Sequence, residues 1–153
     1  MLDIVKKYFN QNEWQFTEVE DKSVLLFGIN GKNGNFQCVA DIIEEEKKFI
    51  FFSVCGANTP AEKRQEMLEL INLMNYDLFF GNFEMDSEDG EVRFKTSIFY
   101  DYIEPSIELI NQMVMTNIIT MDKSLIGMMG LMFGNLTTSE SFEIINKQDE
   151  TSS

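Results

Sequence analysis

The chain has 153 residues, the size of a single domain, and 44% of them are hydrophobic, so it should fold around one core. Its 26 Asp and Glu residues against 12 Lys and Arg give a net charge of -14, which argues against nucleic-acid binding because phosphates would be repelled. It contains no histidine, which excludes His-based catalytic triads, His-ligated zinc and imidazole acid–base chemistry.

The first half of the chain predicts one helix followed by four strands. Apolar residues recur at helical spacing over residues 2–9, which indicates a short amphipathic helix. The apolar period then changes to two, as in strands. The predicted strands are residues 14–16, 24–29, 36–43 and 49–54, separated by polar or glycine-rich turns.

The second half predicts a helix, two strands and a final helix. Thr59, Pro60 and Glu62 have the spacing of a capping box with proline at the first helical position, so a helix should begin there and end near Asn75. Strands are expected at residues 78–85 and 92–100, around an Asp-Gly turn. The final helix should begin near Pro105 and bury one face, formed by Ile103, Ile107, Ile110, Val114, Ile118 and Met121.

This order, α-β-β-β-β-α-β-β-α, predicts an α+β fold. Neighbouring strands with short turns favour a mainly antiparallel sheet with the helices segregated on it. We expect one domain over residues 1–135. Residues 136–153 are mostly polar and are predicted to be a mobile tail.

The compartment is predicted from the N-terminus and the apolar runs. Lys6 and Lys7 interrupt the stretch in which a secretory signal would need a continuous apolar run. The uncharged stretches 109–121 and 124–139 are too short or too interrupted to span a bilayer. We therefore expect a cytoplasmic protein without membrane insertion.

No residue pattern predicts a catalytic, metal or cofactor site. The acidic turn before Gly90 fails as a calcium loop, because its frame would place Met85 and Thr96 where carboxylate ligands are required. Cys38 and Cys55 would lie opposite each other if their hairpin turned about residues 46–47, and we interpret them as core residues because no basic neighbour activates them. Asp41, in an otherwise apolar strand, should face outward or lie at an edge.

Apolar surface beyond the needs of one core is the main functional signal. Six of the ten methionines lie within residues 113–132, and the final helix carries a second apolar stripe. Strand 49–54 alternates so that both sheet faces are apolar, with Phe52 on the face that helices on one side would leave open. Gly127, Gly130 and Gly134 predict either a helix break after Asp122 or a close backbone approach. The candidate partner-binding residues are Met115, Ile119, Ile126, Met129, Phe133 and Phe52.

Several segments in the middle of the chain resemble one family. They are Glu62-Lys63-Arg64 with Leu70 to Asn75, Gly81 to Asp86, and Glu88 to Phe94. Together with the aromatic and glycine-rich segment 14–34, they are similar to the bacterial YbjN-domain family, and the resemblance ends near Gly134.

The resemblance implies an α+β domain similar to the chaperones of type III secretion, which form homodimers and hold extended segments of client proteins. YbjN-like proteins are described as sensory transduction regulators. The family pattern offers no catalytic residue, and Asn75, Gly81 and Gly90 match its recognisable positions as turn or cap residues.

Two functions follow from these observations. The leading hypothesis is a noncatalytic protein-binding module, chaperone-like or a regulatory adaptor, that forms a homodimer or holds a protein client through apolar surface and an acidic face. The alternative is a small-molecule-binding or carboxylate-based enzymatic α+β domain. Neither hypothesis requires a cofactor.

Overall fold

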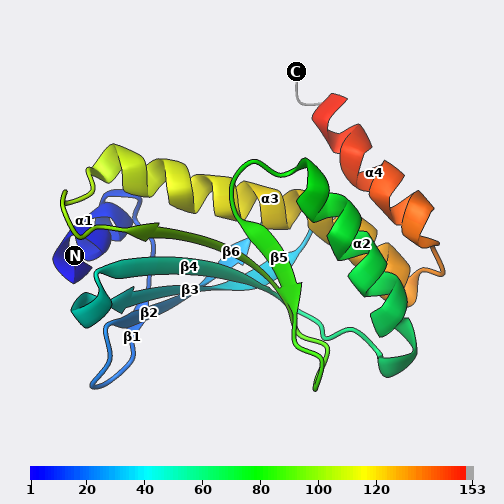
Figure 1. The fold of residues 1–153 in the computed structure, drawn as a ribbon, viewed down its shortest axis with the longest axis horizontal. Helices are drawn as coiled ribbons and strands as arrows, with labels where there is room; N and C mark the ends of the chain where they lie inside the picture. Colours follow the sequence, from blue (N-terminus) through cyan, green and yellow to red (C-terminus); the bar gives the residue numbers. More distant parts are fainter. Residues whose placement is uncertain (151–153) are drawn as a thin grey trace.

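The computed structural model describes the backbone of residues 1–150 and the side chains of residues 1–148. Within these residues the chain forms an α+β fold with a six-stranded antiparallel sheet, as predicted, and four α-helices, one more than predicted (Figure 1). The helices are α1 (Leu2–Gln11), α2 (Arg64–Asp77), α3 (Ile107–Phe133) and α4 (Thr138–Glu150). The strands are β1 (Thr17–Glu18), β2 (Val24–Asn30), β3 (Asn35–Ile43), β4 (Lys48–Cys55), β5 (Asn82–Met85) and β6 (Val92–Phe99).

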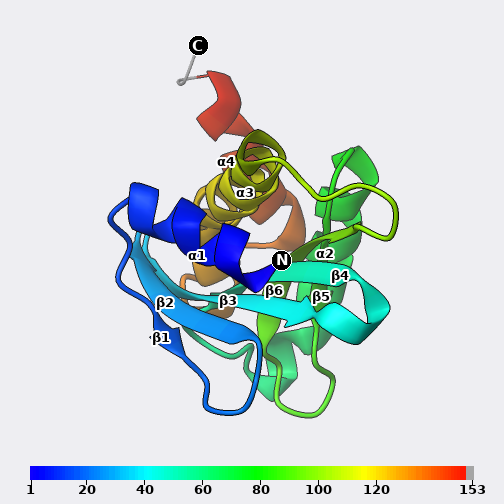
Figure 2. The ribbon, with the colours of Figure 1, turned by 90° about the vertical axis from the view of Figure 1, so that its left-hand side faces the viewer.

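The sheet has the strand order β1-β2-β3-β4-β6-β5, and every neighbouring pair is antiparallel. Figures 1 and 2 show α1 and α3 lying across one face of this sheet, with α2 and α4 beside its β5 end. No helix of residues 1–150 covers the opposite face. None of the helices within residues 1–150 is both long and apolar enough to cross a bilayer.

Side chains of β4 alternate between the two faces as predicted. Phe49, Phe51 and Cys55 are buried on the helix-covered face, whereas Ile50 and Phe52 are only partly buried on the other. This alternation follows from the period of two in a pleated strand. The covered face therefore holds the core.

The sequence prediction of a strand at residues 14–16 was wrong. Trp14 stacks on Phe27 with ring centroids 5.2 Å apart, and Phe9 and Phe16 pack edge to face at 5.7 Å. Glu13 has a positive φ of 57°, which turns the chain from α1 directly into this aromatic cluster. Only Thr17–Glu18 pair with β2.

The capping box predicted at Thr59 does not form. A short 3-10 turn occupies Ala61–Lys63, and α2 begins only at Arg64. The backbone of Thr59 is held by the β5–β6 hairpin instead, because its N–H donates to the Gly90 carbonyl over 2.8 Å. The Thr59 hydroxyl is buried without a hydrogen-bond partner in the described residues.

Helix α3 is continuous over 27 residues, so the break considered after Asp122 is absent. Ser106 caps it by accepting a hydrogen bond from the Leu109 N–H over 3.2 Å, and Ile103 lies outside the helix and is exposed. The close approach considered as the alternative is present. A Cβ at Gly127 would lie 2.6 Å from the Ser141 carbonyl oxygen of α4.

Helix α4 replaces the mobile tail predicted after residue 135, so that prediction was wrong for residues 138–150. Ile145 and Ser141 are buried against the rest of the protein despite the polar composition of the segment. Thr137 and Glu140 begin the helix with reciprocal hydrogen bonds, in which Glu140 accepts from the Thr137 N–H over 2.8 Å. A few apolar residues are enough to pack α4 against the domain, because Gly127 has no side chain and lets the α4 backbone approach α3 closely. Residues 151–153 lie outside the described chain.

Two further predictions need correction in register and length. Cys38 lies opposite Ser53 and Cys55 opposite Phe36, so the cysteines are not paired across the strands. The β3–β4 turn is centred between residues 45 and 46, one residue before the centre that would pair them, and each partner is therefore shifted by two residues. Strand β5 begins at Asn82 and not at residue 78, because the Asn75 side chain binds the backbone of Phe83 through both its amide nitrogen and its oxygen, over 3.0 and 2.8 Å. The predicted Asp-Gly hairpin between β5 and β6 is present, with Gly90 at φ 81°.

Candidate functional site

The structure places the predicted apolar stripe on the outer side of α3. Ile119, Ile126 and Phe133 are 58%, 41% and 61% exposed. Met115 and Met129 are partly buried, and Met129 packs against the core. The accessible part of the stripe is therefore Ile119, Ile126 and Phe133.

The stripe lies between the β2–β3 hairpin and α4. Asp122 accepts a hydrogen bond from the Asn33 N–H over 2.9 Å, and the Asn33 side chain donates to Gln148 of α4 over 3.0 Å. Shallow hollows of about 420 and about 310 Å³ lie along this junction and include Ile119 and Ile126, respectively, in their walls. The two isoleucines thus line a shallow groove.

Phe52, the sixth candidate, lies on the opposite face of the sheet and cannot share a site with the α3 stripe. The Arg93 guanidinium lies 4.6 Å from the centroid of its ring. Asp41 also faces outward on this open face, as predicted, opposite Ile50 on an interior strand. The sequence-predicted residues therefore define two surfaces.

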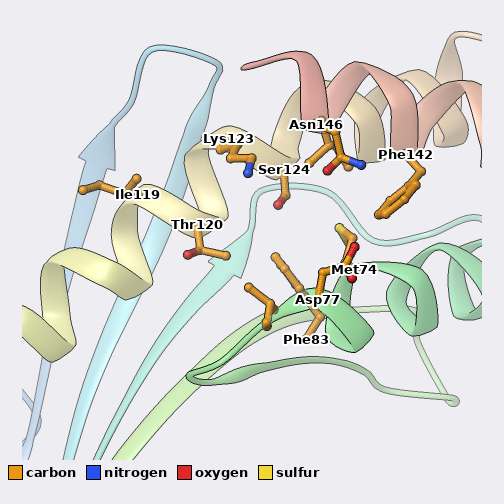
Figure 3. A pocket seen from close by; sticks show the side chains of 11 residues that line it. Met74, Asp77, Phe83, Ile119, Thr120, Lys123, Ser124, Phe142 and Asn146 are labelled. Carbon is orange, nitrogen blue, oxygen red and sulfur yellow. The ribbon is translucent and has the colours of Figure 1, made fainter. Parts of the chain in front are cut away.

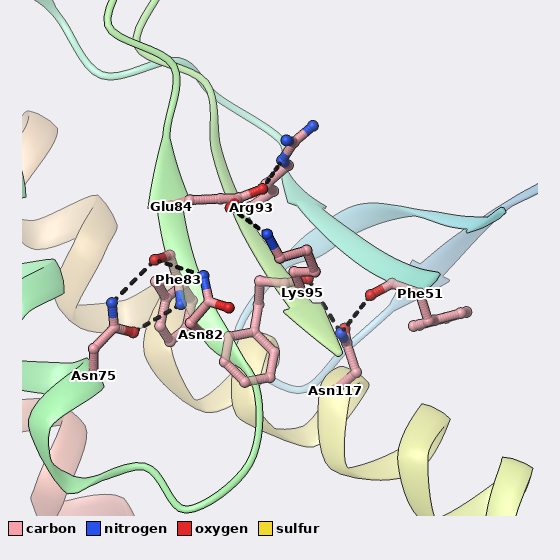
Figure 4. Close-up of polar contacts among 9 residues, drawn as sticks. Phe51, Asn75, Asn82, Phe83, Glu84, Arg93, Lys95 and Asn117 are labelled. Atoms are coloured by element: carbon pink, nitrogen blue, oxygen red, sulfur yellow. Dashed lines mark hydrogen bonds and ion pairs between the residues drawn. The ribbon is translucent and has the colours of Figure 1, made fainter. Parts of the chain in front are cut away.

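The open face also carries a charged cluster (Figure 4). Glu84 accepts from Arg93 and, over 2.8 Å, from Lys95. Partial burial alone would raise the pKa of Glu84, but these two hydrogen bonds and cationic charges outweigh it and lower the pKa below its usual value. The one carboxylate is held between two cations, so the cluster has an excess of one positive charge and leaves no activated acid.

A pocket of about 420 Å³ lies between α2, α3, α4 and β5 (Figure 3). Met74, Phe83 and Phe142 supply apolar walls, while Asp77 and Asn146 supply polar groups. Ile119 lies at its rim, so the pocket adjoins the α3 stripe. Sequence reasoning missed this pocket, because its α4 wall falls in the segment predicted to be a tail.

The cysteines show no sign of reactivity. Burial raises the pKa of Cys38 to about 12, outweighing the opposing hydrogen bond with Ser53, and burial also raises the pKa of Cys55. Both thiols are free. Within residues 1–148 no three His, Cys, Asp or Glu side chains are grouped as metal ligands.

Asn117 is a buried polar residue that sequence reasoning did not single out. Its side-chain nitrogen donates to the carbonyls of Phe51 and Phe94 over 3.0 and 3.1 Å, and to the Thr96 hydroxyl over 3.1 Å (Figure 4). It thereby fixes α3 over the junction of β4 and β6. The sequence signal that could have identified Asn117 is its position on the apolar, core-facing side of α3.

Comparison with known proteins agrees with this architecture. The family model YbjN, described as a "putative bacterial sensory transduction regulator", matches residues 1–123. A search of curated proteins finds no match. Among solved structures the chain is similar to that described as the "crystal structure of YbjN, a putative transcription regulator from E. coli", with a TM-score of 0.55, 9% identity, and 99% of this chain and 93% of that chain covered.

The fold and the family match define an α+β domain of a family that is described as bacterial regulators. The chain belongs to the YbjN family. The family match ends inside α3, whereas the structural similarity extends over nearly the whole chain and therefore includes α4.

Proposed function

We propose that this protein is a noncatalytic, cytoplasmic regulatory module that acts by binding protein through the outer stripe of α3. The single observation that carries this proposal is the exposure of Ile119, Ile126 and Phe133 on one side of a helix whose other side forms the core. Contiguous exposed apolar side chains on a folded domain usually mark an interface. The family description as a regulator supports a binding role.

A homodimer is the simplest occupant of this stripe, because each copy presents the same apolar side chains to a twofold partner. A protein client of apolar character is the other occupant that the stripe fits. In both cases the contact removes the same isoleucines from water, at about 25 cal/mol per Å² of apolar area. Both occupants can therefore be tested with the same substitutions.

The test is light scattering coupled to size exclusion at micromolar concentration. We expect wild-type protein to elute as a dimer and the double variant Ile119→Asp with Ile126→Asp to elute as a folded monomer, because two charges would be buried at the contact. Leu109→Asp is the matched control, because Leu109 is 44% exposed on α3 but lies off the stripe. Leu109→Asp should remain dimeric.

If wild-type protein is a monomer, the client form of the proposal is tested by affinity purification from the native host. The expected result is a protein captured by wild type and by Leu109→Asp but lost with the stripe variant. Equal capture by all three proteins would contradict the proposal, as would unfolding of the stripe variant, which would show that these isoleucines belong to the core.

A small-molecule-binding function is the second candidate, and the pocket between α2, α3, α4 and β5 is the observation that favours it. Its mixed lining, with the Asp77 carboxylate and the Asn146 amide beside apolar walls, suits a small amphipathic ligand. Thermal-shift screening with amino acids and amines tests this function. Stabilisation that is lost in Asp77→Asn would favour it over the protein-binding proposal.

A further inference from the structure

Half of strand β6 has no neighbouring strand on its outer side. Strand β5 pairs with β6 only as far as Lys95, opposite Asn82, whereas β6 continues to Phe99. The Tyr100 N–H donates to the Lys47 carbonyl over 2.9 Å, on the β4 side. Because alternate residues of an antiparallel strand direct their backbone groups to opposite sides, Ser97 and Phe99 direct theirs away from β4.

No hydrogen bond to the outward backbone groups of Ser97 and Phe99 is found within residues 1–150. An unpaired row of this kind is a template for one more strand. Two residues with outward N–H and C=O groups offer two donors and two acceptors. An extended peptide matches these groups, because its own backbone presents donors and acceptors at the same spacing.

Exposed apolar residues are found at the end of β6 and in the two loops next to this open edge. A Cβ at Gly81 would lie 2.8 Å from the Lys95 carbonyl oxygen, so the loop preceding β5 lies against the edge. Figure 2 shows this loop and the loop after β6 projecting on the same side of the molecule. The exposed apolar residues of the two loops and the strand end are Phe79, Phe80, Phe99, Tyr102 and Ile103.

The opposite edge of the sheet provides an internal comparison. Strand β1 pairs only with Leu25 and Leu26 of β2, and by the same alternation Gly28 and Asn30 direct their backbone groups outward. These two residues offer no apolar side chain to a ligand. The β6 edge differs in combining free backbone groups with exposed aromatic residues, which protected natural edges avoid.

The charge around the β6 edge favours a cationic ligand. Asp77 at the end of α2, and Asp101 and Glu104 in the loop after β6, are exposed and have no ion pair within the described residues. Of the three nearby lysines, Lys48 is paired with Glu46 and Lys95 with Glu84, and the Lys47 ammonium lies 5.8 Å from the centroid of the Tyr100 ring. The edge is therefore locally acidic on a chain of net charge -14.

We propose that the outer edge of β6 at residues 97–99 binds an extended peptide segment of alternating apolar and basic residues as an added strand. This inference goes beyond the proposed function, because it assigns a second surface and a different ligand chemistry from the α3 stripe. A second copy of the chain is disfavoured as the occupant, because it would bring the same carboxylates against this edge.

The probe is a fluorescein-labelled, end-blocked heptapeptide of sequence Lys-Val-Lys-Phe-Lys-Val-Lys, and its binding is measured by fluorescence anisotropy. Two control peptides have the same length. One replaces every Lys by Glu. The other carries N-methyl groups on alternate residues, so the backbone N–H groups along one side of the extended peptide can no longer donate hydrogen bonds. We expect measurable binding of the Lys peptide only, weakening as salt is raised.

Ser97 offers a matched pair of variants. Ser97→Pro removes the outward N–H and leaves the β4 side of the ladder intact, whereas Ser97→Ala retains the N–H. One lost backbone hydrogen bond corresponds to about fivefold weaker binding. We therefore expect Ser97→Pro to bind the peptide at least about fivefold more weakly and Ser97→Ala to bind it as wild type does.

An aromatic pair tests the site without touching the strand. Phe79 and Phe133 are both exposed, so Phe79→Ser and Phe133→Ser should both fold. Only Phe79→Ser should weaken peptide binding, because Phe133 lies at the end of α3. This pair keeps the proposal testable if Ser97→Pro fails to fold.

Three results would overturn the proposal: no binding of the Lys peptide, equal binding of the N-methylated peptide, or equal binding by Phe79→Ser and Phe133→Ser. A change of oligomeric state in Ser97→Pro with unchanged peptide binding would also overturn it and would assign the edge to a second copy. Peptide binding by the Ile119→Asp and Ile126→Asp variant separates the two surfaces. Retained binding there, with dimerisation lost, supports both proposals, and each proposal can fail while the other stands.

Discussion

The two faces of the sheet are built from the same strands but differ in what covers them. On β4, Phe51 is fully buried under the helices, whereas its neighbour Phe52 is covered only partly, by the Arg93 guanidinium. Similar apolar residues can therefore serve as core on one side and as accessible surface on the other. Whether such a residue is buried or accessible depends on which face the helices cover, and it cannot be read from the side chain alone.

The largest expected difference between the faces is in thiol reactivity. Cys38 and Cys55 are buried on the covered face, and burial raises the pKa of Cys38 to about 12. Gln37→Cys places a thiol on the open face, one residue from Cys38. In native protein we expect the new thiol to react with a maleimide about a thousandfold faster than the two natural thiols, which require an opening of the core.

Mass spectrometry of the labelled protein over time measures this difference, and labelling in denaturant confirms that three thiols are present. Modification of Cys38 in native protein at the rate of the new thiol would show that the covered face opens readily. That result would remove the distinction between the faces.

The second difference is in stability. Phe51→Ala removes a fully buried ring that lies 6.0 Å from the Phe27 ring, so we expect it to lower the free energy of unfolding by about 3–5 kcal/mol. Phe52→Ala removes a partly exposed ring and its contact with Arg93, at a cost of about 1 kcal/mol. Urea denaturation measures both values, and equal losses would contradict the assignment of Phe52 to accessible surface.

Two glycines extend the comparison to backbone contacts. A Cβ at Gly127 would lie 2.6 Å from α4 backbone, so Gly127→Ala should displace α4 and destabilise the protein by about 1–3 kcal/mol. A Cβ at Gly28 on the open face would lie 3.5 Å from the Gln37 side chain, an ordinary contact. Gly28→Ala should therefore be neutral or stabilising by about 0.5–1 kcal/mol. Thermal and urea unfolding of both variants check the contrast.

The sequence predicted the element order and the sheet class because both depend on local patterns. The change from helical spacing to a period of two located α1, β2, β3 and β4 closely, and the Asp-Gly turn located the β5–β6 hairpin. The predictions failed where distant contacts override local preference. Thr59 is held by Gly90 and does not cap α2, and Trp14 packs on Phe27 and does not enter a strand.

The candidate site was predicted in part for the same reason. Periodicity placed Ile119, Ile126 and Phe133 on one side of α3, and the structure exposes them there. Periodicity could not show that α4 and the β2–β3 hairpin lie beside the stripe, because Asn33 meets Asp122 and Gln148 only after folding. It also could not show that β5 stops at Asn82 and leaves the end of β6 unpaired.

The smallest expected effect concerns the charged cluster of the open face, and it depends on pH. The hydrogen bonds from Lys95 and Arg93 lower the pKa of Glu84, although partial burial opposes them. A carboxylate whose pKa is lower in the folded state stabilises that state above its unfolded pKa and loses the contribution as pH falls through the folded value. Glu84→Gln should therefore destabilise the protein near neutral pH and have less effect below about pH 4.

Solvent screening keeps this difference to about 1 kcal/mol or less at neutral pH. The measurement is the free energy of unfolding of wild type and Glu84→Gln at several pH values between about 3 and 7. Glu20→Gln is the control, because Glu20 is exposed and has no ion pair within the described residues. If Glu84→Gln and Glu20→Gln show the same small, pH-independent change, the cluster adds no stability to the open face. The open face would then be stabilised only by the core on the other side of the sheet.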